Sequence, residues 1–197
     1  MRNIHFHACL CGLLMLLVFS TLSAYAAPPI DGFISVPWGS SREQVQKAME
    51  ERGFTLLEQR DDGFSDTYQG TFTGQPAQLR FIYEKNVFYK GEAAFLHVRD
   101  KDYYAVKAYY TELKGLLTAK YGPPVERSSI GSQPLSYSKW EDLPATTSHP
   151  GQVTIMLREG PELFWPEKNH SSYSVIVSYD IGSSWARQIA VKDIKDI

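Results

Sequence analysis

The chain has 197 residues, and its 20 lysine and arginine residues against 22 aspartate and glutamate residues give a formal net charge of −2 at pH 7. Neither sign of charge gathers in one stretch, which argues against a nucleic-acid surface or a polybasic membrane anchor. The composition is ordinary apart from its aromatic residues, and the 12 tyrosines favour strand-rich structure.

The first 26 residues have the pattern of a cleavable signal peptide. Arg2 supplies a positive charge, an apolar run extends from Leu10 to Leu22, and Ala24-Tyr25-Ala26 fits the small-x-small rule for cleavage. The apolar run is shorter than the roughly 20 residues that a membrane-spanning helix needs. We therefore expect cleavage after Ala26, a mature chain of residues 27–197 without a membrane span, and a periplasmic or secreted destination.

Both cysteines of the chain, Cys9 and Cys11, lie inside this predicted signal peptide. They precede its apolar core, whereas the modified cysteine of a lipoprotein signal follows the core. The mature chain is therefore expected to have no lipid anchor, no disulfide and no thiol chemistry, and its core alone must hold it together.

A short strand followed by a helix opens the mature chain. Phe33, Ile34 and Val36 indicate the strand after a stiff Pro28-Pro29 leader. Ser40 and Glu43 form a predicted capping box. The residues expected to shape the helix after this cap are Val45, Ala48 and Met49 on its inner face, and Gly53 just after its last turn.

An antiparallel meander is predicted next. Its strands are expected at Phe54–Arg60, Thr67–Thr73, Ala77–Glu84 and Val87–Val98. Leu79, Phe81 and Tyr83 show the two-residue period of a half-buried strand. Gly74-Gln75 and Lys85-Asn86 are short enough to be hairpin turns. Gly91 is interpreted as a bulge.

The second helix, around Tyr103–Lys120, has the strongest pattern in the chain. Asp100 or Asp102 caps it, and Tyr121-Gly122-Pro123-Pro124 ends it, because glycine turns the chain and proline cannot continue the helix. Its predicted inner stripe is Tyr103, Val106, Tyr110, Leu113 and Leu117.

Four more strands are predicted after this helix, at Val125–Ser129, Leu135–Trp140, Gln152–Glu159 and Tyr173–Ile181. Long connections at Glu141–Gly151 and Gly160–Ser172 separate the later ones. Ser183 or Ser184 then begins a short amphipathic helix with Trp185, Ile189 and Val191.

Both halves of the mature chain, about 33–98 and 100–197, therefore have a helix followed by about four strands. Runs of antiparallel strands after each helix imply an α+β fold with the helices packed on one face of a sheet. No linker of changed composition separates the halves, so we expect one α+β domain, residues 27–197, with internal pseudo-symmetry.

Two short motifs resemble those of small exported bacterial proteins. PWGSSREQVQKAM is similar to their W-G-x-S-x-x-x-V openings, and AKYGPP resembles the K-Y-G-x-P ending of a long helix. The helix-then-strands unit is also similar to BamE-type envelope domains and to tandem β-lactamase-inhibitor-protein-like modules. The resemblance implies a protein that binds other proteins, although the chain departs from those families in lacking a lipid-anchor cysteine and disulfides. Both motifs are interpreted as structural signals, one for the start of a helix and the other for the end of a helix.

No catalytic, metal or cofactor site is predicted from residue spacing. The mature chain has three histidines, His97, His149 and His170, without the ligand spacing of a zinc site. Ser40-Ser41 and Ser183-Ser184 are interpreted as helix caps, and no nucleophile elbow or phosphate-binding loop is present. Asp61, Asp62 and Asp66 are interpreted as a solvated turn, since they lack calcium-loop spacing.

The surface feature that stands out is Phe164-Trp165-Pro166 in the loop before the last strand. Large aromatics in a charged loop can anchor a partner protein, and burial of the loop over a sheet edge is the alternative. Trp38 and Trp140 adjoin regular structure and are predicted to be core residues.

We therefore predict an exported, non-catalytic binding or interaction module of the bacterial envelope, whose partner is another envelope or secreted protein. The alternative is a small hydrolase or ligand-binding enzyme in which His149 or His170 works with carboxylates such as Glu159 or Glu162. Such an enzyme needs a pocket that joins those groups.

Overall fold

The computed structural model describes residues 27–60, 63–95, 103–127, 136–145, 149–160 and 172–188. Its helices are α2 (Arg42–Glu51) and α3 (Tyr103–Tyr121), and residues 183–188 are also helical. Its strands are β1 (Gly32–Phe33), β2 (Val36–Pro37), β3 (Thr55–Gln59), β4 (Ser65–Phe72), β5 (Gln75–Glu84), β6 (Val87–Phe95), β7 (Val125–Arg127), β8 (Ser136–Leu143), β9 (Gly151–Gly160) and β10 (Ser172–Asp180). The predicted signal peptide and the two predicted caps Asp100 and Asp102 lie outside the described residues.

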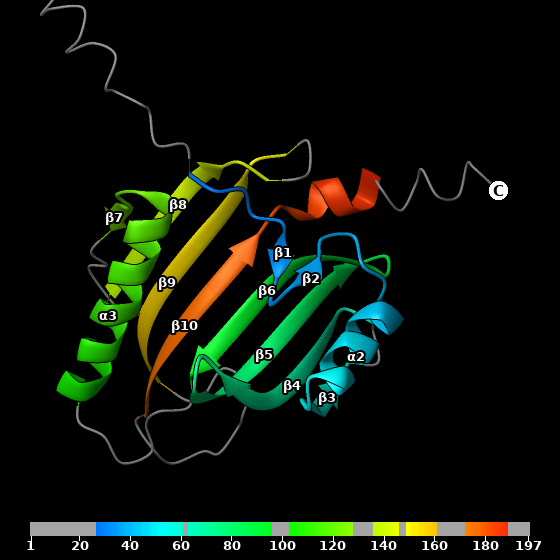
Figure 1. The fold of residues 1–197 in the computed structure, drawn as a ribbon, viewed down its shortest axis with the longest axis horizontal. Coiled ribbons are helices and arrows are strands. Elements are labelled where there is room, and N and C mark those ends of the chain that lie inside the picture. Colours follow the sequence, from blue (N-terminus) through cyan, green and yellow to red (C-terminus); the bar gives the residue numbers. More distant parts are fainter. Residues whose placement is uncertain are drawn as a thin grey trace, which may run out of the picture.

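Eight strands form one antiparallel sheet in the order β3-β4-β5-β6-β10-β9-β8-β7. Strands β3 to β6 pair in chain order, β7 to β10 do the same, and the two runs meet where β6 pairs with β10, with Phe95 opposite Val175. Helices α2 and α3 and the β1-β2 hairpin lie on one face of this sheet (Figure 1). The predicted α+β fold with two helix-then-strands halves is confirmed.

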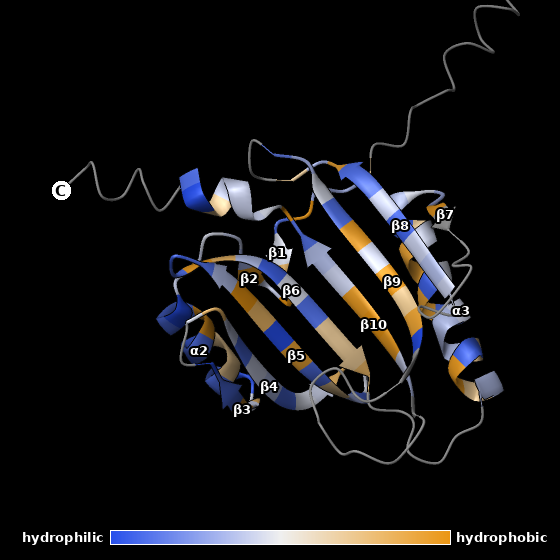
Figure 2. Ribbon diagram, turned by 180° about the vertical axis from the view of Figure 1, so that it is seen from behind, coloured by the Kyte–Doolittle hydropathy of each residue, from blue (hydrophilic) through white to orange (hydrophobic). Residues whose placement is uncertain are grey.

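The two faces of the sheet differ in chemistry because side chains alternate along each strand. Leu79 and Phe81 of β5 and Ile155 of β9 are fully buried on the helix side. On the other face, Glu92 lies 3.8 Å from Arg80 and 2.9 Å from Lys90 in a row of paired charges. Figure 2 views the sheet from behind, and hydrophobic and hydrophilic residues alternate along its strands.

Helix α2 begins one residue later than the sequence predicted. Ser41 is its N-cap: the Ser41 hydroxyl accepts from the Gln44 backbone N–H (3.4 Å), and the Ser41 backbone N–H donates to Gln44 Oε1 (2.8 Å). The Ser40 hydroxyl instead donates to the Pro37 carbonyl (2.8 Å). The sequence offers the capping box in two adjacent registers, Ser40 with Glu43 and Ser41 with Gln44, so the pattern alone does not choose between them.

Helix α3 packs through its predicted stripe. Val106, Tyr110 and Leu117 are buried, while Tyr103 and Leu113 are half-buried against the core. Tyr110 also shares a hydrogen bond of 2.9 Å with the Ser138 hydroxyl of β8. Gly122 takes a φ of +85°, as expected for a residue just past a helix.

Gly91 is not a bulge. It pairs in register with Phe81 and Tyr179, and the bulge lies beside it, where the β5-β6 register shifts between Ile82 and Tyr83. A Cβ on Gly91 would lie 2.2 Å from ring atoms of Phe33, so the glycine makes room for that ring in the middle of the sheet. The need for a small residue comes from the hairpin packed above it, which strand periodicity does not reveal.

Other boundaries differ from the prediction by small amounts. The β4-β5 turn is Thr73-Gly74 rather than Gly74-Gln75, and both its residues have positive φ, as a type I′ hairpin turn requires. Strand β8 continues to Leu143 through an irregularity at which Asp142 has a φ of +52°, so the following connection is shorter than predicted.

Asp66 is buried, which corrects its interpretation as part of a solvated turn. Its side chain is 1% exposed, and Arg42 Nε donates to both carboxylate oxygens, at 2.9 and 2.8 Å. The Tyr83 hydroxyl donates to the same carboxylate at 3.2 Å. A buried carboxylate needs such partners, and here they fix the start of α2 to the sheet.

The predicted core tryptophans are confirmed. Trp38 is 8% exposed and Trp140 is 2% exposed, and each indole N–H has a partner: Trp38 donates to the Ile30 carbonyl (3.0 Å) and Trp140 to the Gly122 carbonyl (2.7 Å). Trp185 of the short helix at residues 183–188 is also buried, while Ile189 and Val191 lie outside the described residues.

Candidate functional site

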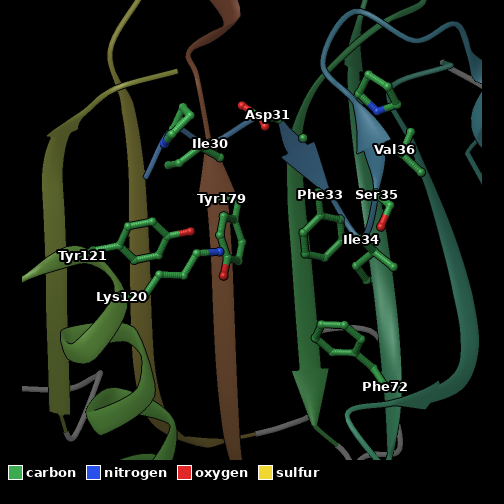
Figure 3. A pocket seen from close by; sticks show the side chains of 13 residues that line it. Ile30, Asp31, Phe33, Ile34, Ser35, Val36, Phe72, Lys120, Tyr121 and Tyr179 are labelled. Atoms are coloured by element: carbon green, nitrogen blue, oxygen red, sulfur yellow. The ribbon is translucent and has the colours of Figure 1, made fainter. Parts of the chain in front are cut away.

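A cleft of about 450 Å³ opens on the helix side of the sheet, between the C-terminal end of α3 and the β1-β2 hairpin (Figure 3). It lies where the two halves of the chain meet, because Tyr179 of β10 belongs to its lining and β10 pairs with β6. Ligand sites are commonly concave, largely apolar and of this size, with a few polar groups that fix orientation. The cleft is therefore the candidate site.

One wall of the cleft is apolar and comes from the first half of the chain. Phe33 and Ile34 of the hairpin and Phe72 at the end of β4 lie along it (Figure 3). Phe33 is held by edge contacts with Phe81 at 5.4 Å between ring centroids, and Phe72 stacks on Phe95 at 6.0 Å. These contacts fix the apolar wall before any ligand arrives.

The opposite wall is polar and comes from the second half. A hydrogen bond joins the side chains of Tyr121, the last residue of α3, and Tyr179 of β10. Burial raises the pKa of both phenols above the ordinary value, so both stay protonated at neutral pH. The Lys120 ammonium lies 5.0 Å from the centre of the Tyr121 ring.

Asp31 contributes a carboxylate to the same cleft from the segment before β1. Asp31 is exposed. The pKa of Tyr121 is raised mainly by burial and is lowered by the hydrogen bond with Tyr179, and the negative charge of Asp31 raises it as well. In Figure 3 the Asp31 carboxylate and the Lys120 ammonium enter from different sides. The cleft therefore combines one negative group, one positive group and two neutral hydroxyls.

The hairpin that forms the apolar wall is tied to the body of the protein at several points. The Ile30 backbone N–H donates to the Pro144 carbonyl (2.8 Å), and Trp38 holds the Ile30 carbonyl through its indole. At the tip, Ile34 has a φ of +51°, an unusual conformation for a β-branched residue. Arg52 of the segment after α2 donates to the Ile34 carbonyl, so this strained turn is held from outside.

A second cavity, of about 370 Å³, lies among residues of β8, the start of β9 and the end of β10. It is lined among others by Lys139, Glu141, His149, Asp180 and Ser184. The Asp180 carboxylate already accepts from the Gly182 backbone N–H at 2.6 Å and from the Gln152 side chain at 3.4 Å. In the part of the chain that the structure describes, no group of three histidine, cysteine, aspartate or glutamate side chains is placed to hold a metal ion.

The sequence-predicted candidates are distributed differently from the expectation. Phe164, Trp165 and Pro166 lie outside the described residues, as do His97, His170 and Glu162. His149 shares the second cavity with Glu141 and Asp180. Glu159 lies toward the opposite end of β9 from His149, paired with Tyr173, so the structure does not bring these two together.

The cleft itself was not predicted from the sequence. Lys120 and Tyr121 stand in the K-Y-G-x-P motif, whose pattern indicates only the end of a helix. The motif does end the helix, but its first two side chains also line the cleft. A lysine-tyrosine pair at the last turn of an amphipathic helix was the available signal, and its partners Asp31 and Tyr179 are far away in the sequence.

Comparisons with protein-family models, with curated proteins and with solved structures gave no match to this chain. Within the described residues, no helix is both long and apolar enough to cross a membrane.

Proposed function

We propose that this protein is an exported, non-catalytic binding module of the bacterial envelope and that its ligand occupies the cleft between α3 and the β1-β2 hairpin. Export rests on the signal-peptide pattern of the first 26 residues. N-terminal sequencing of the protein recovered from the periplasm or the culture fluid tests this step, with Ala27 expected as the first residue.

The observation that carries the binding proposal is the pair of neutral tyrosine hydroxyls set against an apolar wall. A general base works best with a pKa near the operating pH, whereas burial moves the pKa of Tyr121 and Tyr179 upward, away from neutrality. Such hydroxyls remain hydrogen-bond donors and acceptors, which suits recognition of a ligand rather than proton transfer.

The rigidity of both walls supports the same proposal. Phe33, Phe72 and Tyr179 are each fixed by ring contacts with the core or with one another, including 5.7 Å between the Phe33 and Tyr179 rings. A preformed site loses little conformational freedom when it binds, which increases affinity for a given contact area. A partner protein that inserts one side chain into the cleft would gain from this as much as a small molecule.

A fragment screen monitored by amide NMR tests the proposal, because it needs no identified ligand. We expect fragments that bind to shift amide signals of cleft residues such as Gly32, Ser35 and Lys120, while Gln152 and Gly182 beside the second cavity stay in place. No fragment-induced shift at the cleft, or shifts only at the second cavity, would overturn the proposal.

The second cavity supports a second candidate, a small hydrolase, because it places His149 together with Glu141 and Asp180. This candidate predicts hydrolysis of simple ester or amide substrates that is lost in His149→Gln but retained in Tyr179→Phe. Turnover that is unchanged in His149→Gln, or no turnover by the wild-type protein, would contradict it.

A further inference from the structure

We propose that the cleft selects a zwitterion with a large apolar substituent, the chemistry of a hydrophobic α-amino acid. This inference rests on the proposed function and adds the class of ligand. It follows from three properties of the lining that occur together: opposite charges on side chains from different elements, the neutral hydroxyls of Tyr121 and Tyr179 on the side of Lys120, and an apolar wall opposite the tyrosines.

The charges of the lining decide between ionic classes. Among the described residues, Asp31 and Lys120 are the charged side chains that line the cleft, and they come from different elements, the segment before β1 and the last turn of α3. A ligand with only a carboxylate leaves Asp31 facing its negative charge, and a ligand with only an ammonium group leaves Lys120 facing its positive charge. A zwitterion gives each of the two side chains an opposite charge.

The tyrosine pair favours a carboxylate on the side of Lys120. Tyr121 is adjacent to Lys120 in the chain, and the lysine ammonium lies against its ring. Each phenol has one proton, and the hydrogen bond between Tyr121 and Tyr179 uses one of the two, so the pair can donate its remaining proton to a carboxylate oxygen next to the ammonium group. Asp31 then faces the ammonium end of the ligand.

The apolar wall gives the ligand its third feature. Phe33 and Ile34 of the hairpin lie opposite the polar side of the cleft, with Phe72 beside them (Figure 3). Phe33 is 2% exposed, so the apolar surface open to a ligand comes mainly from the half-buried Ile34 and Phe72. The volume of about 450 Å³ exceeds the need of a small polar amino acid and leaves room for a large side chain against them. Ligands with a short side chain would leave this apolar surface uncovered and bind more weakly.

Calorimetric titration with four probes tests the inference. The probes are L-phenylalanine, 3-phenylpropionate (no ammonium group), 2-phenylethylamine (no carboxylate) and L-alanine (no large side chain). We expect L-phenylalanine to bind at least about tenfold more tightly than each of the other three, since one hydrogen bond to a charged group or one buried ring is worth that factor or more.

Two substitutions assign the charges. Asp31→Asn should lower the affinity for L-phenylalanine to the level of 3-phenylpropionate, which lacks the ammonium group. The same substitution should not weaken the binding of 3-phenylpropionate itself. Lys120→Met should lower the affinity for L-phenylalanine to the level of 2-phenylethylamine, which lacks the carboxylate, without weakening the binding of 2-phenylethylamine itself. The matched control Lys47→Met, at an exposed position of α2, should leave all four affinities unchanged.

The outcomes separate this inference from the function on which it depends. Equal binding of L-phenylalanine and 3-phenylpropionate, or no binding of any of the four probes by a protein whose cleft binds other fragments, overturns the zwitterion and leaves the binding function standing. If no fragment shifts the cleft signals and no probe binds, both proposals are wrong.

Discussion

The substitution Gly91→Ala is expected to destabilise the protein although it adds only one methyl group. The new Cβ would lie 2.2 Å from two ring atoms of Phe33, whereas carbon atoms in contact prefer about 3.5–4.0 Å. The Phe33 ring would have to move by roughly 1.3 Å or more. It is 2% exposed and packs on Phe81 and Tyr179, so little room is available.

Overpacking of this kind costs about 1–3 kcal/mol. The upper bound is the loss of the whole Phe33 contact, which is worth about 3–5 kcal/mol when a buried phenylalanine is truncated to alanine. Urea unfolding followed by tryptophan fluorescence measures the difference as a lower midpoint at an unchanged slope. The exposed helix position Gly115, with nothing within 4 Å of its Cβ, gives a control of opposite sign. Gly115→Ala should stabilise by about 0.5–1 kcal/mol.

A double-mutant cycle isolates the proposed collision. If Phe33 is the obstacle, Gly91→Ala should cost little in a Phe33→Ala background, with a coupling energy of about 1–3 kcal/mol between the two sites. Additive costs, or a Gly91→Ala protein within about 0.5 kcal/mol of the wild type, would refute the packing of the hairpin against β6.

Two further predictions concern α3 and the pH dependence. Leu117→Ala should lower the free energy of unfolding by about 2–5 kcal/mol, because Leu117 is 8% exposed. The control Leu116→Ala, at a position that is 61% exposed, should change it by less than about 0.5 kcal/mol. If urea unfolding gives similar losses for both variants, α3 does not pack through the predicted stripe. Burial, reinforced by the Asp66 carboxylate, raises the pKa of Tyr83 far above its unfolded value of about 10, so the folded state keeps a proton that the unfolded chain loses. The contribution of Tyr83 to the free energy of unfolding is therefore fully present below pH ~10 and is lost as the pH rises further. Tyr83→Phe should make this decrease shallower by up to about 1.4 kcal/mol per pH unit. If the free energy of unfolding falls equally steeply with pH in both proteins between pH 9 and 11.5, the prediction is wrong.

The local signals in the sequence predicted the elements well where one segment carries all the information. The inner stripe of α3 corresponds to a buried face, because it depends only on the spacing of residues within the helix. Leu79, Phe81 and Tyr83 of β5 are buried as predicted, but the strand is not half-buried, since Gln78 and Ile82 on its other face are buried as well.

The predictions were wrong where the environment of a residue depends on a side chain from a distant part of the sequence. Asp66 follows a turn and reads as solvated, but Arg42 buries it. Gly91 reads as a bulge, but it makes room for Phe33.

The candidate site shows the same division more sharply. In a sequence, histidines and aromatic residues in loops stand out as candidate site residues. The cleft is built instead from residues whose sequence pattern indicates only a helix end or a core position. Lys120 and Tyr121 stand at a helix end, and Phe33 stands in a two-residue strand. Their shared surface exists only because the hairpin and the end of α3 lie side by side over one sheet.

The sequence by itself therefore determined the two helix-then-strands halves, since capping, turn chemistry and hydrophobic period act over a few residues and are written locally. Only the tertiary structure decided that the halves share one sheet through β6 and β10 and that Asp31, Lys120 and Tyr179 surround a common cleft. The physical reason is that strand pairing and side-chain packing between distant segments depend on the complementarity of two surfaces, and no single stretch of the chain contains both.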